Sequence, residues 1–229
     1  MEMQADIRYS FTAQFLRGAA IFANRAHAIE ESDVPITEEL NAEHRACVVA
    51  TVTQATAALE SEISEVLMHG PGHHLGSDKT DAAGRDFLSP LAEVVDRQQT
   101  LHRYNLVLHL LRKPRIDLGA EPYQSADLLV GLRNDLIHYR SEWGSSMDSK
   151  KLLAALRQLR FAKPPFVSMN TNFFPHRCLS ASLASWTVTT TARFIDSFYG
   201  KLGIVSPLTP YTAQLRVPRP HKAAPNSSG

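Results

Sequence analysis

One stretch of the chain, residues 132–140, combines an arginine, an amide, a histidine and a tyrosine with an apolar helical pattern: Arg133, Asn134, His138 and Tyr139. A histidine side chain, whose ordinary pKa is about 6.5, can accept or donate a proton near neutral pH. An arginine guanidinium can hold a crowded anionic phosphorus centre with its fork of N–H donors. These residue types therefore indicate proton transfer at a phosphate, a chemistry that needs no metal ion.

Helical spacing decides which of these side chains share a face. At 100° per residue, Asn134 and His138 lie about 40° apart, whereas Arg133 and His138 lie about 140° apart. Arg133 can therefore meet His138 only by curling around the helix edge or by coming from a symmetry-related chain. We expect the stretch to be half of a site, in which Asn134 orients the imidazole or contacts the phosphate.

The run Arg133 to His138, RNDLIH, resembles the R-polar-x-x-x-H signature of the HEPN superfamily. Members of that superfamily are four- or five-helix bundles and often metal-independent ribonucleases. The resemblance implies an endoribonuclease with Arg133, His138 and Asn134 as catalytic residues, whose products carry a 2′,3′-cyclic phosphate and a free 5′-hydroxyl. Tyr139 follows His138 directly, which departs from the R-x4-H-x-Y subgroup, so an activity specific to that subgroup's tyrosine is not carried over.

The resemblance also implies a homodimer, because one histidine does not comfortably serve as base and acid in the same step and a two-fold interface would supply two. Gly131, one turn before Asn134, would let another helix approach closely. A role in toxin–antitoxin systems, stress response or phage defence is implied as well, with RNA and an antitoxin protein as partners.

Other interpretations of the same residues stay open. The chain is alternatively a catalytically inactive HEPN-like module that dimerises and binds a nucleotide, RNA or protein, or an unrelated helical interaction protein. His138 is then an ordinary histidine, and Arg133 is the ion-pair partner of Asp127 or Asp135. Glu60 either buttresses the arginine from another helix or remains an exposed glutamate.

Charge is unevenly distributed along a chain whose net charge is only +1. Residues 1–96 hold 6 Lys/Arg and 16 Asp/Glu, whereas residues 97–229 hold 18 Lys/Arg and 7 Asp/Glu. This asymmetry predicts a basic surface backed by an acidic half, unless the segments interleave in space and their fields cancel. Arg140, Arg112 and Lys150 are weaker candidates for contacts with RNA.

Length and composition fit one cytoplasmic, globular domain. The 229 residues can bury a sizeable core, and 44% of them are hydrophobic and 21% charged. Cys47 and Cys178 are too distant in sequence to form a zinc or redox motif. We expect no membrane span, no cofactor and no metal, with residues 1–203 as a HEPN-like helical domain and residues 204–229 as a flexible, basic, proline-rich tail.

Apolar periodicity and turn formers predict an all-α bundle of four or five helices with an extra C-terminal helix. Its helices are expected over residues 6–31, 37–68, 90–112, 123–143, 150–159 and 178–200. The motif helix should bury Leu129, Leu132, Leu136 and Tyr139 and present Asp127, Gly131, Asn134 and His138 on a second face.

Two further expectations concern the second helix and the loop after it. Glu60, Glu62 and Glu65 should lie mostly away from the buried stripe of that helix. The loop of residues 69–84 holds three histidines, which raises a metal site as an alternative. They lack the helical i, i+4 spacing of metal ligands, so a solvated loop is favoured.

Overall fold

The computed structural model describes residues 10–75, 82–95, 98–138 and 151–219, and within these ranges it confirms the all-α prediction. The α-helices are α1 (Thr12–Glu30), α2 (Glu38–His69), α3 (Ala82–Val95), α4 (Thr100–Leu110), α5 (Tyr123–Ile137), α7 (Lys151–Gln158) and α8 (Ala181–Leu202). Shorter helical turns are η1 (His73–Leu75), η2 (Phe173–Arg177) and η3 (Thr209–Tyr211).

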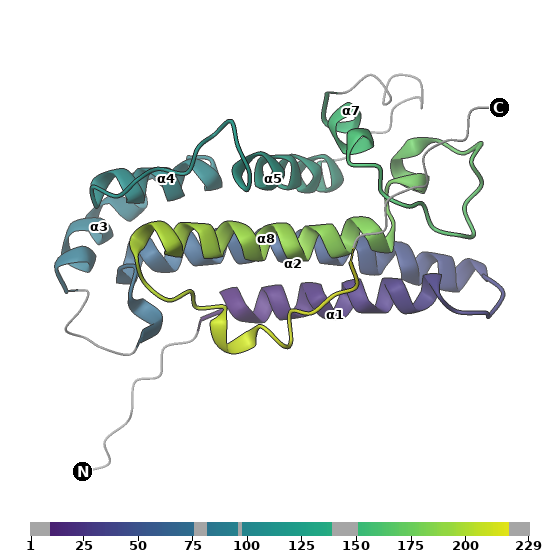
Figure 1. The fold of residues 1–229 in the computed structure, drawn as a ribbon, viewed down its shortest axis with the longest axis horizontal. Coiled ribbons are helices and arrows are strands. Elements are labelled where there is room, and N and C mark those ends of the chain that lie inside the picture. Colours follow the sequence, from purple (N-terminus) through teal and green to yellow (C-terminus); the bar gives the residue numbers. More distant parts are fainter. Residues whose placement is uncertain (1–9, 76–81, 96–97, 139–150, 220–229) are drawn as a thin grey trace, which may run out of the picture.

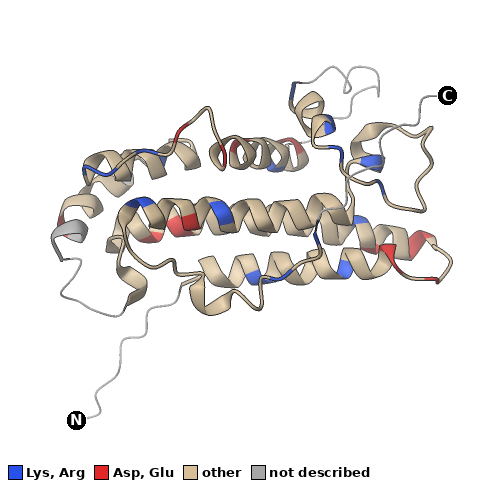
Figure 2. Cartoon of the chain, in the orientation of Figure 1, with Lys and Arg blue, Asp and Glu red and all other residues tan. Residues whose placement is uncertain are grey.

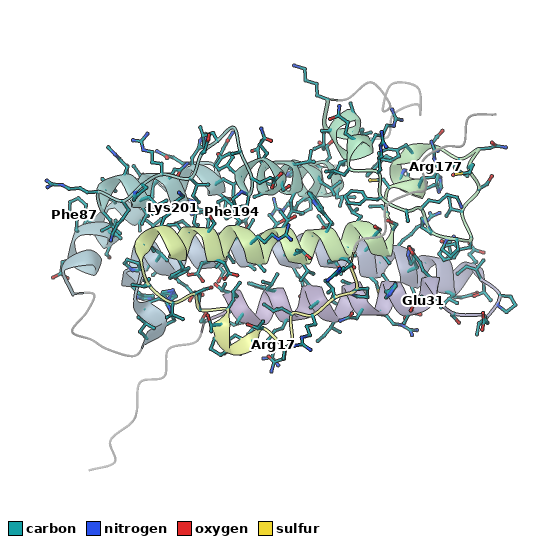
Figure 3. The ribbon with its side chains drawn as sticks, in the orientation of Figure 1. Arg17, Glu31, Phe87, Arg177, Phe194 and Lys201 are labelled. Carbon is teal, nitrogen blue, oxygen red and sulfur yellow. The ribbon has the colours of Figure 1, made fainter. Side chains whose placement is uncertain are left out.

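Three long helices, α1, α2 and α8, form the body of the molecule, and α4 and α5 lie in a row alongside it, on the side away from α1 (Figure 1). The helix α2 lies at the centre because α1, α3, α4, α5 and α8 all pack against it. An aromatic cluster joins the two layers: Tyr104 of α4 meets Phe194 and Phe198 of α8 edge to face at 5.0 and 4.9 Å between ring centroids. Figure 3 shows Phe194 on the side of α8 that faces the α4–α5 layer.

The ends of α2 follow the sequence signals. The side chain of Thr37 accepts a hydrogen bond from the backbone N–H of Leu40 at 3.2 Å, so it caps the first turn as its position predicts. At the other end Gly70 has a φ of +85°, a conformation that favours glycine, and its N–H donates to the carbonyl of Val66 at 2.8 Å.

The prediction of one helix over residues 90–112 is wrong. The structure has two helices there, α3 and α4, and Pro90 lies inside α3 rather than in a first turn. The run from Asp96 to Gln99 has no apolar side chain to anchor a continuing helix to the core, and the backbone of Gln99 is non-helical, with φ −59° and ψ 136°.

The prediction of a flexible tail from residue 204 is wrong for residues 204–219, a segment we call the strap. Leu208 of the strap is only 3% exposed, the guanidinium of Arg17 lies 5.5 Å from the centroid of the Tyr211 ring, and Asn24 Nδ2 donates to the carbonyl of Arg216 at 3.1 Å. Figure 3 shows Arg17 on α1 at the strap. The strap is anchored by these side chains, while residues 220–229 lie outside the described part.

The acidic and basic halves of the chain interleave. The basic strap lies along α1, and α8, from the second half, packs against α1 and α2, from the first half (Figures 1 and 2). Figure 2 shows one group of acidic residues around the turn between α1 and α2, and others around α5 and on α8. None of the described helices is long and apolar enough to cross a membrane.

A buried carboxylate attaches α8 to α1 and α2. Glu30 Oε1 accepts the first N–H of α8, from Ala181, at 2.7 Å, and also contacts His44 Nε2 at 2.8 Å. The His44 side chain is 1% exposed and that of Glu30 is 12% exposed, so water cannot readily replace the lost acceptor. A negative charge at a helix N-terminus is itself favourable.

We therefore expect Glu30→Ala to lower the free energy of unfolding by about 2–3 kcal/mol, because it leaves a buried amide and a buried ring without their acceptor. Urea denaturation measures this loss. The neighbouring Glu31→Ala is a matched control, since the Glu31 side chain is 67% exposed and its loss should cost less than about 1 kcal/mol. Equal losses in the two variants would contradict the capping role of Glu30.

Candidate functional site

The helix α5 carries the motif, and its apolar face packs as predicted. Leu129 and Leu132 are fully buried, and the half-buried Leu136 packs against the core. Their spacing of three and four residues turns one stripe toward α2 and α8 and leaves the polar face outward. Tyr139, the last member of the predicted stripe, lies outside the described residues.

The helix ends earlier than predicted. Its last helical residue is Ile137, not a residue near Trp143, and His138 is the C-cap, with φ −101° and ψ 28°. The backbone N–H of His138 donates to the carbonyl of Asn134 at 2.9 Å, and its side chain is exposed. The histidine is therefore presented to solvent at the end of a rigid helix, where a substrate or another chain can reach it.

Arg133 extends toward α2 instead of curling toward His138. Its Nη1 donates to Asn134 Oδ1 at 3.1 Å, and its Nη2 lies 3.8 Å from Glu60 Oε1. Neither Asp127 nor Asp135 is its partner, and Glu60 takes the buttressing position that the sequence left as one of two alternatives. The two side chains are 27% and 38% exposed, so the pair is partly hydrated and worth less than about 1 kcal/mol.

A cleft of about 770 Å³ lies beside this ion pair. Three of the four residues predicted to share a face, Asp127, Gly131 and Asn134, line it, whereas His138 does not. The opposite walls come from Glu60 of α2, the start of α4 and the inner face of α7. The motif face of α5 therefore opens onto this cleft, whereas His138 lies at the end of the helix, outside the lining.

Gly131 permits close helix packing, as predicted, but the packed helix belongs to the same chain. A Cβ atom at position 131 would lie 3.2 Å from Cδ1 of Leu152, on α7. The face that the sequence offered to a second motif helix is therefore covered by α7. A second chain would have to approach α5 from its outer edge or its C-terminal end.

The lining of this cleft is acidic and rich in amides. Its three carboxylates belong to Glu60, Glu121 and Asp127, and its one ammonium group belongs to Lys151. Its side-chain amides are those of Gln98, Gln99, Gln124, Asn134 and Gln158. Such a lining repels phosphate groups. A phosphate would be held more favourably at the guanidinium of Arg133 than deep inside the cleft.

The weaker RNA-binding candidates are not brought together by the described structure. Arg112 follows the end of α4, where its backbone has a φ of +55° and its side chain is exposed. Arg140 and Lys150 lie outside the described residues. Lys151, at the start of α7, is the described basic residue that reaches the cleft.

Sequence reasoning missed a buried polar cluster that begins at Glu62 of α2, just beyond Glu60. Glu62 is fully buried and accepts a hydrogen bond from the hydroxyl of Tyr199, and His73 Nε2 lies 3.3 Å from Glu62 Oε1. The other ring nitrogen of His73 lies 3.7 Å from Glu65 Oε2. The prediction that Glu62 lies away from the buried stripe is wrong, because α2 is covered on several sides.

The predicted solvated histidine loop is also wrong where the structure describes it. The side chain of His73 is 2% exposed, and His74 Nε2 lies 2.8 Å from the carbonyl of Val205 in the strap. For the burial of Glu62 the sequence did hold a signal, because Glu62 follows Leu59 by three residues and so lies beside the buried stripe of α2. Among the described residues no group of three or more His, Cys, Asp or Glu side chains is arranged to hold a metal ion.

Burial controls the protonation of the cluster. It raises the pKa of Glu62 to about 7, an effect that the hydrogen bond from Tyr199 opposes and the charge of Glu65 reinforces. Burial, followed by the charge of Glu62, also raises the pKa of Tyr199, which therefore stays a hydrogen-bond donor. The cluster joins α2, η1 and α8, and it is closed to substrates.

Comparison with known proteins gives no assignment: no family model, no curated protein and no solved structure matches the chain. A function must therefore be inferred from the side chains at the end of α5 and from the cavities around them.

Proposed function

We propose that this protein is a metal-independent endoribonuclease of HEPN type, built on a HEPN-like bundle and acting as a homodimer. The observation that carries the proposal is that a guanidinium, from Arg133, and an exposed imidazole, from His138, both lie in the last turns of α5. Arg133 is held beside Asn134 at 3.1 Å, and His138 stands at the C-cap of the same helix. Loss of the weak contact with Glu60 would free the guanidinium for a phosphate at little cost.

The reaction needs only proton transfers and charge stabilisation. One imidazole removes the proton of the 2′-hydroxyl, the O2′ atom attacks the adjacent phosphorus, and the P–O5′ bond breaks. A second, protonated imidazole delivers a proton to the departing O5′. Arg133 stabilises the negative charge that gathers on the phosphoryl oxygens during this step, and the products are a 2′,3′-cyclic phosphate and a free 5′-hydroxyl.

The second imidazole is supplied by a second copy of the chain. Because α7 covers the Gly131 face, the two copies would meet at the C-terminal ends of their α5 helices. Ile137, which is 50% exposed there, provides apolar surface beside His138. A two-fold axis near this residue would bring both histidines to one phosphate. Cleavage of cellular RNA by such a dimer would suit a role in stress response or phage defence, under the control of an antitoxin protein.

The acidic cleft favours a second candidate, a catalytically inactive HEPN-like module. The carboxylates of Glu60, Glu121 and Asp127 suit a partner that is neutral or basic better than a phosphate. In that case Arg133 is a structural residue that links α5 to α2, and the cleft binds a protein segment.

Incubation of purified protein with total RNA in EDTA separates the two candidates. Cleavage by the wild type that disappears in His138→Ala supports the enzyme. Equal cleavage by both proteins points to a contaminating nuclease, and absence of cleavage by dimeric wild type supports the inactive module.

A further inference from the structure

A second cavity, of about 1080 Å³, lies on the other side of the α5 N-terminus. Its walls are the middle of α8, the segment around Phe161, the start of α5 and the last described residues of the strap, 217–219. It shares Glu121, Ser125 and Leu159 with the cleft beside Arg133, so the two cavities are neighbours with a common wall. The proposed reaction uses none of the residues that are particular to this cavity.

The floor of this cavity is aromatic. Trp186 of α8 and Phe161 are both half-buried, with ring centroids 5.5 Å apart and planes inclined at 57°. Both rings line the cavity while packing against the core, so their positions are fixed before any ligand arrives. A fixed tryptophan at the wall of an open cavity is a platform on which a flat ring can stack.

The rim of the cavity carries charges of both signs. Arg193 of α8 and Arg219 of the strap are exposed, and each offers a guanidinium that can hold a phosphate with two N–H groups. Asp196 and Glu121 add carboxylates, which accept hydrogen bonds from the exocyclic amino groups of nucleobases. The aromatic floor suits the face of a base, the carboxylates suit its amino groups, and the guanidinium groups suit the phosphate of the same nucleotide.

We infer that this cavity binds a nucleotide of single-stranded RNA, with its base on Trp186 and Phe161 and its phosphate at Arg193 and Arg219. The inference rests on the proposed function, since it supplies the substrate-binding surface that the acidic cleft does not provide. A duplex is excluded, because its bases are paired and stacked and cannot enter a pocket.

Tryptophan fluorescence tests the inference directly. The sequence contains two tryptophans, so Trp143→Phe leaves Trp186 as the single reporter, and His138→Ala in the same chain prevents cleavage during the titration. We expect a ten-nucleotide oligoadenylate to quench this emission saturably, and the same oligonucleotide within a duplex to leave it unchanged. Stacking of a base on an aromatic side chain is the contact that such quenching reports.

Variants of the rim residue Arg193 distinguish binding of a nucleotide in this cavity from nonspecific attraction of RNA to a charged surface. Arg193→Ala should weaken binding of the oligoadenylate about tenfold, and Arg193→Lys should restore part of it, since a lysine keeps the charge without the fork. Lys201→Ala, on the same helix but outside the lining, is the matched control and should bind as the parent does. Figure 3 shows Lys201 near the opposite end of α8 from the strap segment at the pocket.

Three results would overturn the pocket: no quenching at saturating oligoadenylate, equal quenching by duplex RNA, or equal affinities for Arg193→Ala and Lys201→Ala. Failure of the pocket is distinct from failure of the proposed enzyme. Cleavage of RNA by the wild type without any response of Trp186 would remove the pocket and leave the enzyme standing. Quenching of Trp186 emission in a protein whose wild type never cleaves RNA would remove the enzyme and leave the pocket standing.

Discussion

His138→Ala should lower the rate of RNA cleavage by about 10²–10⁴-fold, the range that a positioned general acid or base contributes. In the proposed dimer the substitution removes both proton-transfer groups from the shared site at once. Arg133→Ala should lower the rate by about 10²–10³-fold, because it removes donors to the phosphoryl oxygens. Initial rates on a fluorescent RNA substrate in EDTA measure both losses.

The stability of each variant shows whether a loss of activity comes from the site or from unfolding of the protein. His138 is exposed and Arg133 makes only a partly hydrated ion pair, so each variant should unfold within about 1 kcal/mol of the wild type. His109→Ala and Arg25→Ala, at exposed positions of α4 and α1, are matched controls that should keep full activity. If these controls lose as much activity as the motif variants, the assignment of Arg133 and His138 is wrong.

Glu62→Gln should change how stability depends on pH. The ordinary glutamate ionises near pH 4.5 in the unfolded chain, whereas burial keeps the folded Glu62 protonated up to a pKa of about 7. Between these values the unfolded state binds fewer protons, so the contribution of Glu62 to stability is complete below pH 4.5 and is lost as the pH rises to 7. The loss amounts to about 3 kcal/mol.

A glutamine cannot titrate, so the difference in stability between wild type and Glu62→Gln should move by about 3 kcal/mol in favour of the variant from pH 4.5 to pH 8. Urea denaturation at several pH values measures it, and taking the difference cancels the other titrating groups that both proteins share. Glu60→Gln, on the same helix but 38% exposed, should follow the wild type across this range. Parallel curves for wild type and Glu62→Gln would show that Glu62 is not buried as described.

The parts of the fold that sequence predicted are those set by local pattern. The stripe from Leu129 to Leu136 packs into the core, as its helical spacing requires. Thr37 and Gly70 mark the ends of α2, because capping depends only on neighbouring residues. The early end of α5 at Ile137 has no such signal, since neither glycine nor proline follows directly. The histidine of the motif therefore lies at a helix end instead of within a helix.

The parts that sequence missed depend on contacts between distant segments. His73 is separated from Tyr199 by 126 residues, and the two meet only because α8 returns alongside α2. The strap looks disordered from its prolines, yet Leu208 and Tyr211 find partners on the folded body that no local pattern reveals. The same long-range packing brings α7 onto Gly131, which changes where a second chain could bind.

The most direct test of the proposed chemistry is the identity of the ends it produces. Purified wild type should cut single-stranded RNA in EDTA to leave 2′,3′-cyclic phosphate and 5′-hydroxyl ends, and His138→Ala should leave the RNA intact. Products with 3′-hydroxyl and 5′-phosphate ends would require a water molecule as nucleophile. That result, or identical products from the His138→Ala protein, would contradict cleavage by the 2′-hydroxyl at the end of α5.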